Sequence, residues 1–405
     1  MEEFIVDIVK RFLKYVSYET TSDEFSKTKP STNSQVVLLK ELVEELKELG
    51  VDAFYKDGYT YGKVKSDCAK DDTLFLMAHV DTSSDASGKD VKARIVHFTG
   101  EDIILNDKKK LSIDEFPLMK YHLNHDLIVT DGTTLLGADD KAGIAIIMDV
   151  LEKALKKGGY PNITVCFSSD EEIGRGTENI DIDYIKETKG KMYAYTLDGG
   201  CIQAFQNETF NAKQAKVEID GVSIHPSMGK NKLINSQEVF MKFHSLLPLN
   251  RPENTEGREG FIHLTSSNGI TEHSTAIYIL RSFESCELER FENSFYHARD
   301  EINKLYNKDL VNVSIKDQYR NMYDIIKNNH HVVDLVHEVY KELDINLVDV
   351  PIRGGTDGAL LSYLGLPCPN LGTGGDNFHG VLEYLDIDEM KMMTNIISKM
   401  MEHLK

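Results

Sequence analysis

Uninterrupted apolar runs of strand length alternate with helical patterns over roughly the first 200 residues of the chain. The runs at 73–78 and 163–167 consist mostly of residues that favour strands, as is typical of strands covered on both faces. The segments 34–49 and 142–157 have helical spacing, and each is followed by glycine, which commonly ends a helix. This order predicts an α/β domain in which helices cover both sides of a mixed, largely parallel sheet.

The pattern changes after about residue 210. The segment 213–220 alternates between apolar and polar residues, as expected of a strand with one solvent-facing side. The elements predicted after it are a helix at 235–247, strands at 260–266 and 275–283, a helix at 286–305 and a strand at 310–316. This βαββαβ order is that of a ferredoxin-like α+β unit. From about residue 325 the α/β pattern returns, with a final helix from about 386.

A chain of 405 residues is long enough for two domains, because single cores seldom grow beyond roughly 250 to 300 residues. We therefore expect one α/β domain built from residues 1–210 and 325–405. The ferredoxin-like domain, residues 211–324, would be inserted into it.

Charge and composition narrow the class of protein. The net charge of −20 argues against nucleic acid and anionic membrane surfaces as partners, because both would be repelled. The first residues lack the basic start and apolar run of a signal peptide, and apolar residues from Phe4 to Val16 repeat at helical spacing. The 5 cysteines are odd in number and scattered, which suits reduced thiols. We expect a cytoplasmic protein that does not cross a membrane.

Histidine and acidic residues follow the predicted strands. His79-Val80-Asp81 comes directly after the first apolar run, 170–172 after the second, and Asp198 after the apolar run that begins at 192. Strand carboxyl ends in open α/β sheets are where binding sites collect. Asp139-Asp140 precedes a helix, and His379 lies near the end of the chain. Two imidazoles and three carboxylates, one of them shared, suit a pair of divalent ions such as zinc.

Each cluster also has a structural interpretation when it is taken alone. A single histidine after a strand is often a surface or core residue, and Asp139-Asp140 would serve as an acidic helix N-terminus. The acidic run 170–172 would fit a solvated turn, although adjacent carboxylates repel unless a cation or proton intervenes. Four such clusters in one chain favour a metal site over coincidence.

The chain resembles the M20 family of dizinc peptidases over nearly its whole length, and most closely the tripeptide aminopeptidases of that family. The stretches that carry this resemblance are 30–32, 79–83, 134–145, 170–174, 225–226, 351–359 and 365–371. A single His-x-Asp motif would be weak support, whereas long literal stretches in the same order are strong. The resemblance implies a zinc-peptidase-like catalytic domain and an inserted lid that closes over the active-site cleft.

The resemblance also assigns the metal ligands. Asp139 corresponds to the carboxylate that bridges both ions, with His79 and Asp198 on one ion and Glu172 and His379 on the other. The peptide bond after Asp139 is expected to be cis, as in relatives.

Three further positions match residues that act on the substrate or support the metals, and Arg353 is assigned from its own chemistry. Glu171 corresponds to the general base, and Asp81 supports the centre through His79. His225 corresponds to an oxyanion donor from the inserted domain, although a histidine beside proline is common in loops. Arg353, in a glycine-rich segment, is expected to hold the substrate carboxylate, and a solvated arginine in a turn is the alternative.

The implied activity is release of the N-terminal residue from tripeptides, with a water activated by two zinc ions per subunit as nucleophile. Co²⁺ or Mn²⁺ would also suit the ligands. A dipeptidase, a carboxypeptidase, an N-acyl-amino-acid deacylase and a non-catalytic peptide-binding protein are the alternatives. Small peptides are the expected partners, and both a monomer and a homodimer fit the family. Asp376 stands where relatives tend to carry an aromatic residue, so we expect it to alter pH dependence or substrate preference.

Overall fold

The computed structural model describes residues 7–68 and 70–405, so Phe4 and Ile5 of the predicted first helix lie outside the described residues. The chain forms two compact units. The first comprises the segment up to Asn207 together with Met322–Val350 and Thr356–Lys405. The second comprises Glu208–Asn321 and Pro351–Gly355.

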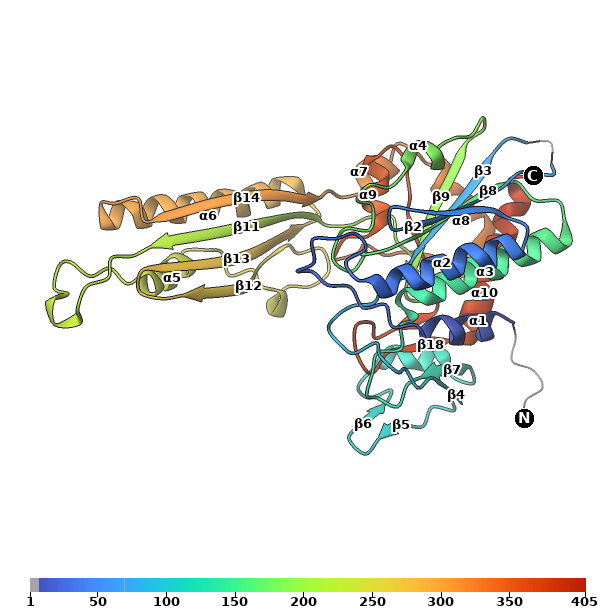
Figure 1. The fold of residues 1–405 in the computed structure, drawn as a ribbon, viewed down its shortest axis with the longest axis horizontal. Coiled ribbons are helices and arrows are strands. Elements are labelled where there is room, and N and C mark those ends of the chain that lie inside the picture. Colours follow the sequence, from blue (N-terminus) through green and yellow to red (C-terminus); the bar gives the residue numbers. More distant parts are fainter. Residues whose placement is uncertain (1–6, 69) are drawn as a thin grey trace. The chain divides into compact units, whose positions relative to one another are not determined.

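A six-stranded sheet forms the centre of the first unit (Figure 1). Its strands, in spatial order, are β1 (Asp52–Lys56), β2 (Tyr59–Val64), β8 (Asn162–Ser168), β3 (Thr73–His79), β9 (Met192–Gly199) and β16 (Asn370–Gly372). The strands from β8 to β16 are parallel, whereas β1 and β2 are antiparallel and form one edge. Every residue of β3 is buried, which explains its uninterrupted apolar run.

Helices cover both faces of this sheet (Figure 1). On one face α2 (Asn33–Glu48) contacts β1 and β2, and α3 (Ala138–Lys157) contacts β3 and β9. On the other face α4 (Ile182–Ile185) and α9 (Asp357–Tyr363) contribute Ile185 and Leu361 to a core that contains Phe75 of β3. The remaining helices of this unit are α1 (Asp7–Val16), α7 (Tyr323–Ile326), α8 (His331–Glu342) and α10 (Ile387–His403).

A second, antiparallel sheet in the first unit was not predicted. Its strands, in order, are β17 (Gly375–Asp376), β18 (Tyr384–Asp386), β7 (Asp126–Val129) and β4 (Arg94–His97). Phe98, Leu127 and Tyr384 are among the residues of a separate small core there. Short elements complete the unit: β5 (Ile103–Asn106), β6 (Lys109–Leu111), the 3-10 helix η1 (Pro117–His122), β10 (Ala204–Phe205) and β15 (Val348–Asp349).

The second unit has the predicted βαββαβ order. Its elements are β11 (Asn211–Asp220), α5 (Ser236–Ser245), β12 (Phe261–Gly269), β13 (His273–Ser282), α6 (Ser285–Tyr306) and β14 (Val311–Tyr319), with short 3-10 helices η2 (Pro226–Met228) and η3 (Pro252–Asn254). The strands pair antiparallel in the order β12-β13-β11-β14. Val239 and Phe243 of α5 and Phe291 and Phe295 of α6 belong to the same core as the strands. Within 7–68 and 70–405, no helix is long and apolar enough to cross a membrane.

Candidate metal centre

Three neighbouring parallel strands bring the predicted clusters together. His79 is the last residue of β3, Asp198 lies at the end of β9, and the acidic run 170–172 follows β8. Because β3 pairs parallel with both β8 and β9, the three carboxyl ends meet at one edge of the sheet. Asp139 reaches this edge from the start of α3, and His379 from the loop between β17 and β18.

Asp139 lies between two pairs of side chains. Its Oδ1 atom is 2.9 Å from Nε2 of His79, which is 3.4 Å from Oδ1 of Asp198. Its Oδ2 atom is 3.3 Å from Nε2 of His379, which is 2.9 Å from Oε2 of Glu172. Each carboxylate oxygen of Asp139 therefore faces a different histidine and a different acidic residue.

Asp81 fixes the orientation of both His79 and the neighbouring acidic run. Nδ1 of His79 lies 3.1 Å from the backbone carbonyl oxygen of Asp81 and 3.5 Å from its Oδ1 atom. The carboxylate of Asp81 accepts the backbone N–H groups of Glu171 at 3.0 Å and Glu172 at 3.2 Å. A proton on Nδ1 of His79 would leave Nε2, the atom that faces Asp139, as a free lone-pair donor.

Glu171 lies at the same edge. One of its carboxylate oxygens, a ring nitrogen of His79 and a carboxylate oxygen of Asp198 all lie within 4.8 Å of one another. Burial, followed by the charge of Asp198, raises the pKa of Glu171 well above its ordinary value. Glu171 is therefore an acidic group whose proton affinity is tuned by its surroundings.

The electrostatics of the cluster suit bound cations. Burial and the charge of Asp139 raise the pKa of Asp198, and burial raises that of Glu172. One oxygen of Glu172, Oε1, is buried without a hydrogen-bond partner. Imidazole nitrogens and carboxylate oxygens are the donors that zinc and similar divalent ions take. The residues present therefore fit a metal centre, which would neutralise the crowded carboxylates and occupy the free oxygen.

Asp140 and Glu383 support the turn that carries Asp139, and sequence reasoning missed both roles. The expected cis peptide bond joins Asp139 to Asp140. The carboxylate of Asp140 accepts the backbone N–H groups of His79 and Gly143, both at 3.2 Å. Glu383 is buried and accepts the N–H of Asp139 at 3.1 Å. In the sequence, Glu383 stands out only as an acidic residue that directly precedes the apolar residues Tyr384 and Leu385 of β18.

Asp170 fixes the start of the acidic run. The backbone of Asp170 has a φ of 63°. Its carboxylate accepts hydrogen bonds from the backbone N–H of Ser31 and from the Nε2 group of Gln35, both at 2.8 Å. The hydroxyl of Ser31 donates to it as well. This buried network explains why the stretch 30–32 belongs with the metal-centre motifs, a link that sequence spacing alone does not show.

The two predicted substrate-binding residues belong to the second unit. His225 is exposed, and its Nδ1 atom lies 2.8 Å from Oγ of Ser227. The guanidinium of Arg353 donates to the carbonyl oxygens of Gly257 and Glu259, both at 2.8 Å, and to Oγ1 of Thr255 at 3.1 Å. Arg353 also lies over the rings of Phe210 and Phe261, at 5.3 and 5.7 Å. It is therefore not the solvated arginine of a simple turn.

Asp376 lies in β17 and accepts a hydrogen bond from the hydroxyl of Tyr384 at 3.1 Å. It thus has a partner within the second sheet of this unit. Its expected influence on pH dependence or substrate preference stays a prediction.

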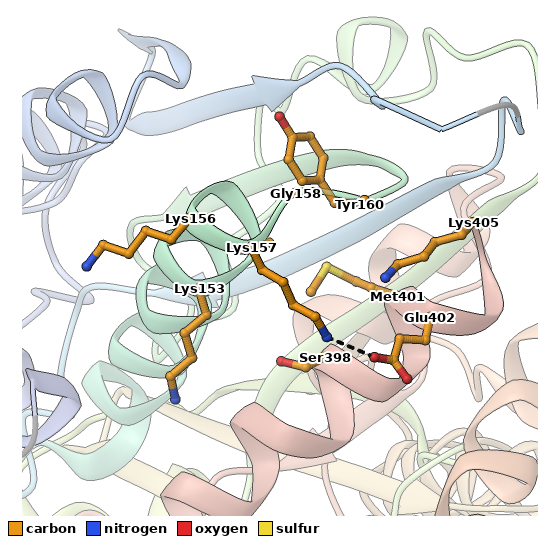
Figure 2. Close-up of a pocket in the computed structure, with 11 residues that line it drawn as sticks. Lys153, Lys156, Lys157, Gly158, Tyr160, Ser398, Met401, Glu402 and Lys405 are labelled. Carbon is orange, nitrogen blue, oxygen red and sulfur yellow. Dashed lines mark hydrogen bonds and ion pairs between the residues drawn. The ribbon is translucent and has the colours of Figure 1, made fainter.

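A hollow of about 470 Å³ lies elsewhere on the first unit, at the ends of α3 and α10 (Figure 2). Three of the lysines that line it are paired: Lys157 with Glu402 at 3.1 Å, Lys156 with Glu152 and Lys153 with Asp149. Cations are expected at the carboxyl end of a helix such as α3. This hollow holds none of the predicted site residues.

Residues 124–403 match the model of peptidase family M20/M25/M40. The chain belongs to this family. Full-length relatives include peptidase T of Caldanaerobacter subterraneus subsp. tengcongensis, 42% identical over 404 residues that cover 98% of each chain. Peptidase T of Clostridium perfringens is 44% identical over 395 residues and 96% of each chain. The chain is therefore a homologue of peptidase T.

Solved structures show the same fold. Aminopeptidase PepT from Bacillus cereus has a TM-score of 0.76 at 20% identity, and a tripeptidase from Staphylococcus aureus has 0.76 at 18%, each covering 98% of both chains. YXEP of Bacillus subtilis, a dinuclear metal binding peptidase of the M20 family, has a TM-score of 0.62 at 11% identity over 97% of this chain and 96% of its own. The largely parallel sheet of the first unit and the antiparallel sheet of the second unit are thus those of the M20 peptidase fold.

Proposed function

We propose that this protein is a metal-dependent aminopeptidase that releases the N-terminal residue of tripeptides. The observation that carries the proposal is the position of Asp139, whose two oxygens face two separate His and carboxylate pairs. The full-length similarity to peptidase T supports the choice of substrate.

The proposed centre would hold two ions, with Asp139 as the carboxylate available to both. His79 and Asp198 would complete one ligand set, and Glu172 and His379 the other, in line with the donor distances of 2.9 to 3.4 Å. Zinc is the first choice, with Co²⁺ and Mn²⁺ as ions that take the same donors. When bound, such ions polarise a scissile carbonyl and lower the pKa of water.

Glu171 is the proposed general base. One of its carboxylate oxygens lies within 4.8 Å of donor atoms of His79 and Asp198, where it would accept a proton from the attacking water and later deliver it to the leaving amine. The backbone N–H of Glu171 is held by the carboxylate of Asp81, which also faces the ring of His79. Asp81 therefore positions the base and a metal ligand together.

The second unit is proposed to act as a ferredoxin-like lid that supplies His225 and Arg353. His225 is exposed and carries a ring N–H that suits a developing oxyanion. Arg353 is a bidentate donor, as recognition of the substrate carboxylate requires. Binding a carboxylate there would replace its bonds to the carbonyl groups of Gly257 and Glu259. We further propose a cytoplasmic enzyme that acts as a monomer or a homodimer.

A panel of three substrates tests the proposed specificity. A free tripeptide, the matching dipeptide and the N-acetylated tripeptide are each incubated with zinc-loaded protein. The proposal predicts cleavage of the free tripeptide and loss of activity when the N-terminus is blocked. Cleavage of the acetylated peptide would indicate a deacylase or carboxypeptidase, and cleavage of the dipeptide alone a dipeptidase. Binding without any product would indicate a peptide-binding protein.

A further inference from the structure

A second group of metal-type donors lies outside the centre described above. It joins the end of η1, the residue before β7, and the residue at which β18 ends and α10 begins. Nδ1 of His122 lies 2.7 Å from Oδ2 of Asp386, and Nδ1 of His125 lies 2.6 Å from the same oxygen. Asp386 is 0% exposed and His122 is 5% exposed. Three donor atoms from two distant segments therefore converge, and two of the three side chains are buried.

A further carboxylate faces this point. Glu389, one turn along α10, is buried, and its Oε1 atom lies 3.8 Å from Nδ1 of His122. Its other oxygen accepts the backbone N–H of Ile202 at 3.2 Å. Two buried carboxylates, of Asp386 and Glu389, therefore lie 2.7 and 3.8 Å from Nδ1 of His122.

Each carboxylate oxygen of Asp386 has two nitrogen partners. Oδ1 of Asp386 already accepts the N–H groups of Asp388 at 2.8 Å and Glu389 at 3.0 Å, as the N-cap of α10. The remaining oxygen, Oδ2, faces Nδ1 of both rings, at separations at or below the short end of ordinary N–H···O bonds. An ion among the three atoms would replace two crowded hydrogen bonds by coordination.

We propose that His122, His125 and Asp386 bind a divalent transition-metal ion, with Glu389 positioned to add a fourth donor. Two imidazole nitrogens and two carboxylates supply four donors of types that zinc takes. The site is separate from the centre at Asp139, and the proposal does not depend on the activity assigned to that centre.

The position of the site suggests a structural role. The backbone N–H of Asp386 donates to the carbonyl of Gly374 at 2.9 Å, so Asp386 closes the base of the segment whose loop carries His379. A bound ion would connect Asp386, and with it the start and end of the segment 374–386, to residues 122–125. Its removal is therefore expected to loosen the support of a residue at the first centre without removing any of that centre's own side chains.

Counting bound ions tests the proposal. Full-length protein and a His125→Gln variant are stripped with chelator and dialysed to equilibrium against buffered free Zn²⁺, and bound zinc per chain is measured by mass spectrometry. Glutamine keeps an N–H donor for Asp386 but removes the imidazole. His125 is used because it is partly exposed, whereas replacement of the buried His122 puts folding at risk. We expect the variant to bind one ion fewer than the native protein.

His97→Gln is the matched control. His97 is exposed, and its Nδ1 atom makes a comparable contact to Oδ1 of Asp126 at 2.8 Å, so its loss should leave the ion count unchanged. Equal zinc binding by native protein and His125→Gln at every free-ion concentration would overturn the proposal and leave a hydrogen-bonded cluster. Because the readout is a difference in bound zinc, failure of the proposed peptidase activity would not change its meaning.

Discussion

The backbone N–H of Asp139 donates a hydrogen bond of 3.1 Å to the buried carboxylate of Glu383. The other oxygen of Glu383 accepts the N–H groups of Leu136 at 2.6 Å and Gly137 at 2.8 Å. Glu383 thus holds the turn that presents Asp139, although the two residues are 244 positions apart. We infer that Glu383 positions the shared carboxylate of the centre.

Replacement of Glu383 by glutamine should weaken metal binding. A carboxamide offers one acceptor oxygen and turns an NH₂ group toward backbone N–H donors, so at least one of the three bonds is lost. Outer supports of metal ligands typically contribute about 10- to 100-fold to metal affinity or activity. Zinc affinity is measured by competition with a chelating dye, with the exposed Glu101→Gln as control. Native affinity in Glu383→Gln would show that the turn holds its shape without the carboxylate.

Glu171 and Glu172 are adjacent but have different proposed roles, so their glutamine variants form a matched pair. Glu171→Gln should retain metal and lose roughly 10²- to 10⁴-fold in kcat, the usual size of general acid–base effects. Glu172→Gln should instead lose metal, because its carboxylate faces His379 at 2.9 Å. Metal content and kcat are measured on both. Near-native turnover of Glu171→Gln would rule out its role as the base.

Arg353→Lys tests recognition of the substrate carboxylate. Lysine keeps the charge but cannot form the two-pronged contact, so KM for a free tripeptide should rise about tenfold. KM for the same peptide with a C-terminal amide should change little. An equal rise for both substrates would mean that Arg353 acts only by holding the loop at Gly257 and Glu259.

Lys141 should make stability depend on pH. It is buried, its Nζ donates to the carbonyl of Tyr18 at 2.8 Å, and burial lowers its pKa to about 7 from 10.5. Between these values the unfolded chain holds a proton that the folded protein has lost, so stability rises with pH across this window. The penalty for burying the ammonium is full below the folded pKa and absent above 10.5.

Thermal unfolding of metal-free protein and of Lys141→Met at about pH 7 and about pH 9 measures this effect. Methionine has a similar length and no titration. The Tm of the native protein should rise relative to that of the variant as the pH increases. A constant difference would show that Lys141 keeps its ordinary pKa in the folded protein.

Much of the fold follows from the sequence because its long elements carry strong patterns. The strand β3 is buried throughout and forms one apolar run. In the second unit, β11 and β14 alternate between buried and more exposed residues over much of their length. The sheet β17-β18-β7-β4 could not be predicted, because its strands are 2 to 4 residues long. Pairing between distant segments, such as β18 with β7, creates these strands.

The residues of the candidate site likewise fall into those that the sequence predicts and those that it does not. His79, Glu171 and Asp198 could be proposed because each lies at or just after the end of a strand that the sequence reveals. The roles of Glu383 and Asp170 could not, since each carboxylate serves partners that are more than 130 positions away in the chain. The cluster of His122, His125 and Asp386 was also missed, because its donors converge only through the unpredicted second sheet.

The most direct test of the central claim is product identification with a single free tripeptide of three different residues. Protein stripped with chelator and the same protein restored with Zn²⁺ are compared, and the products are identified by mass spectrometry. We predict no cleavage after chelation, and release of the free N-terminal amino acid with the remaining dipeptide after restoration. Release of the C-terminal residue, or undiminished cleavage by the stripped protein, would contradict a metal-dependent aminopeptidase.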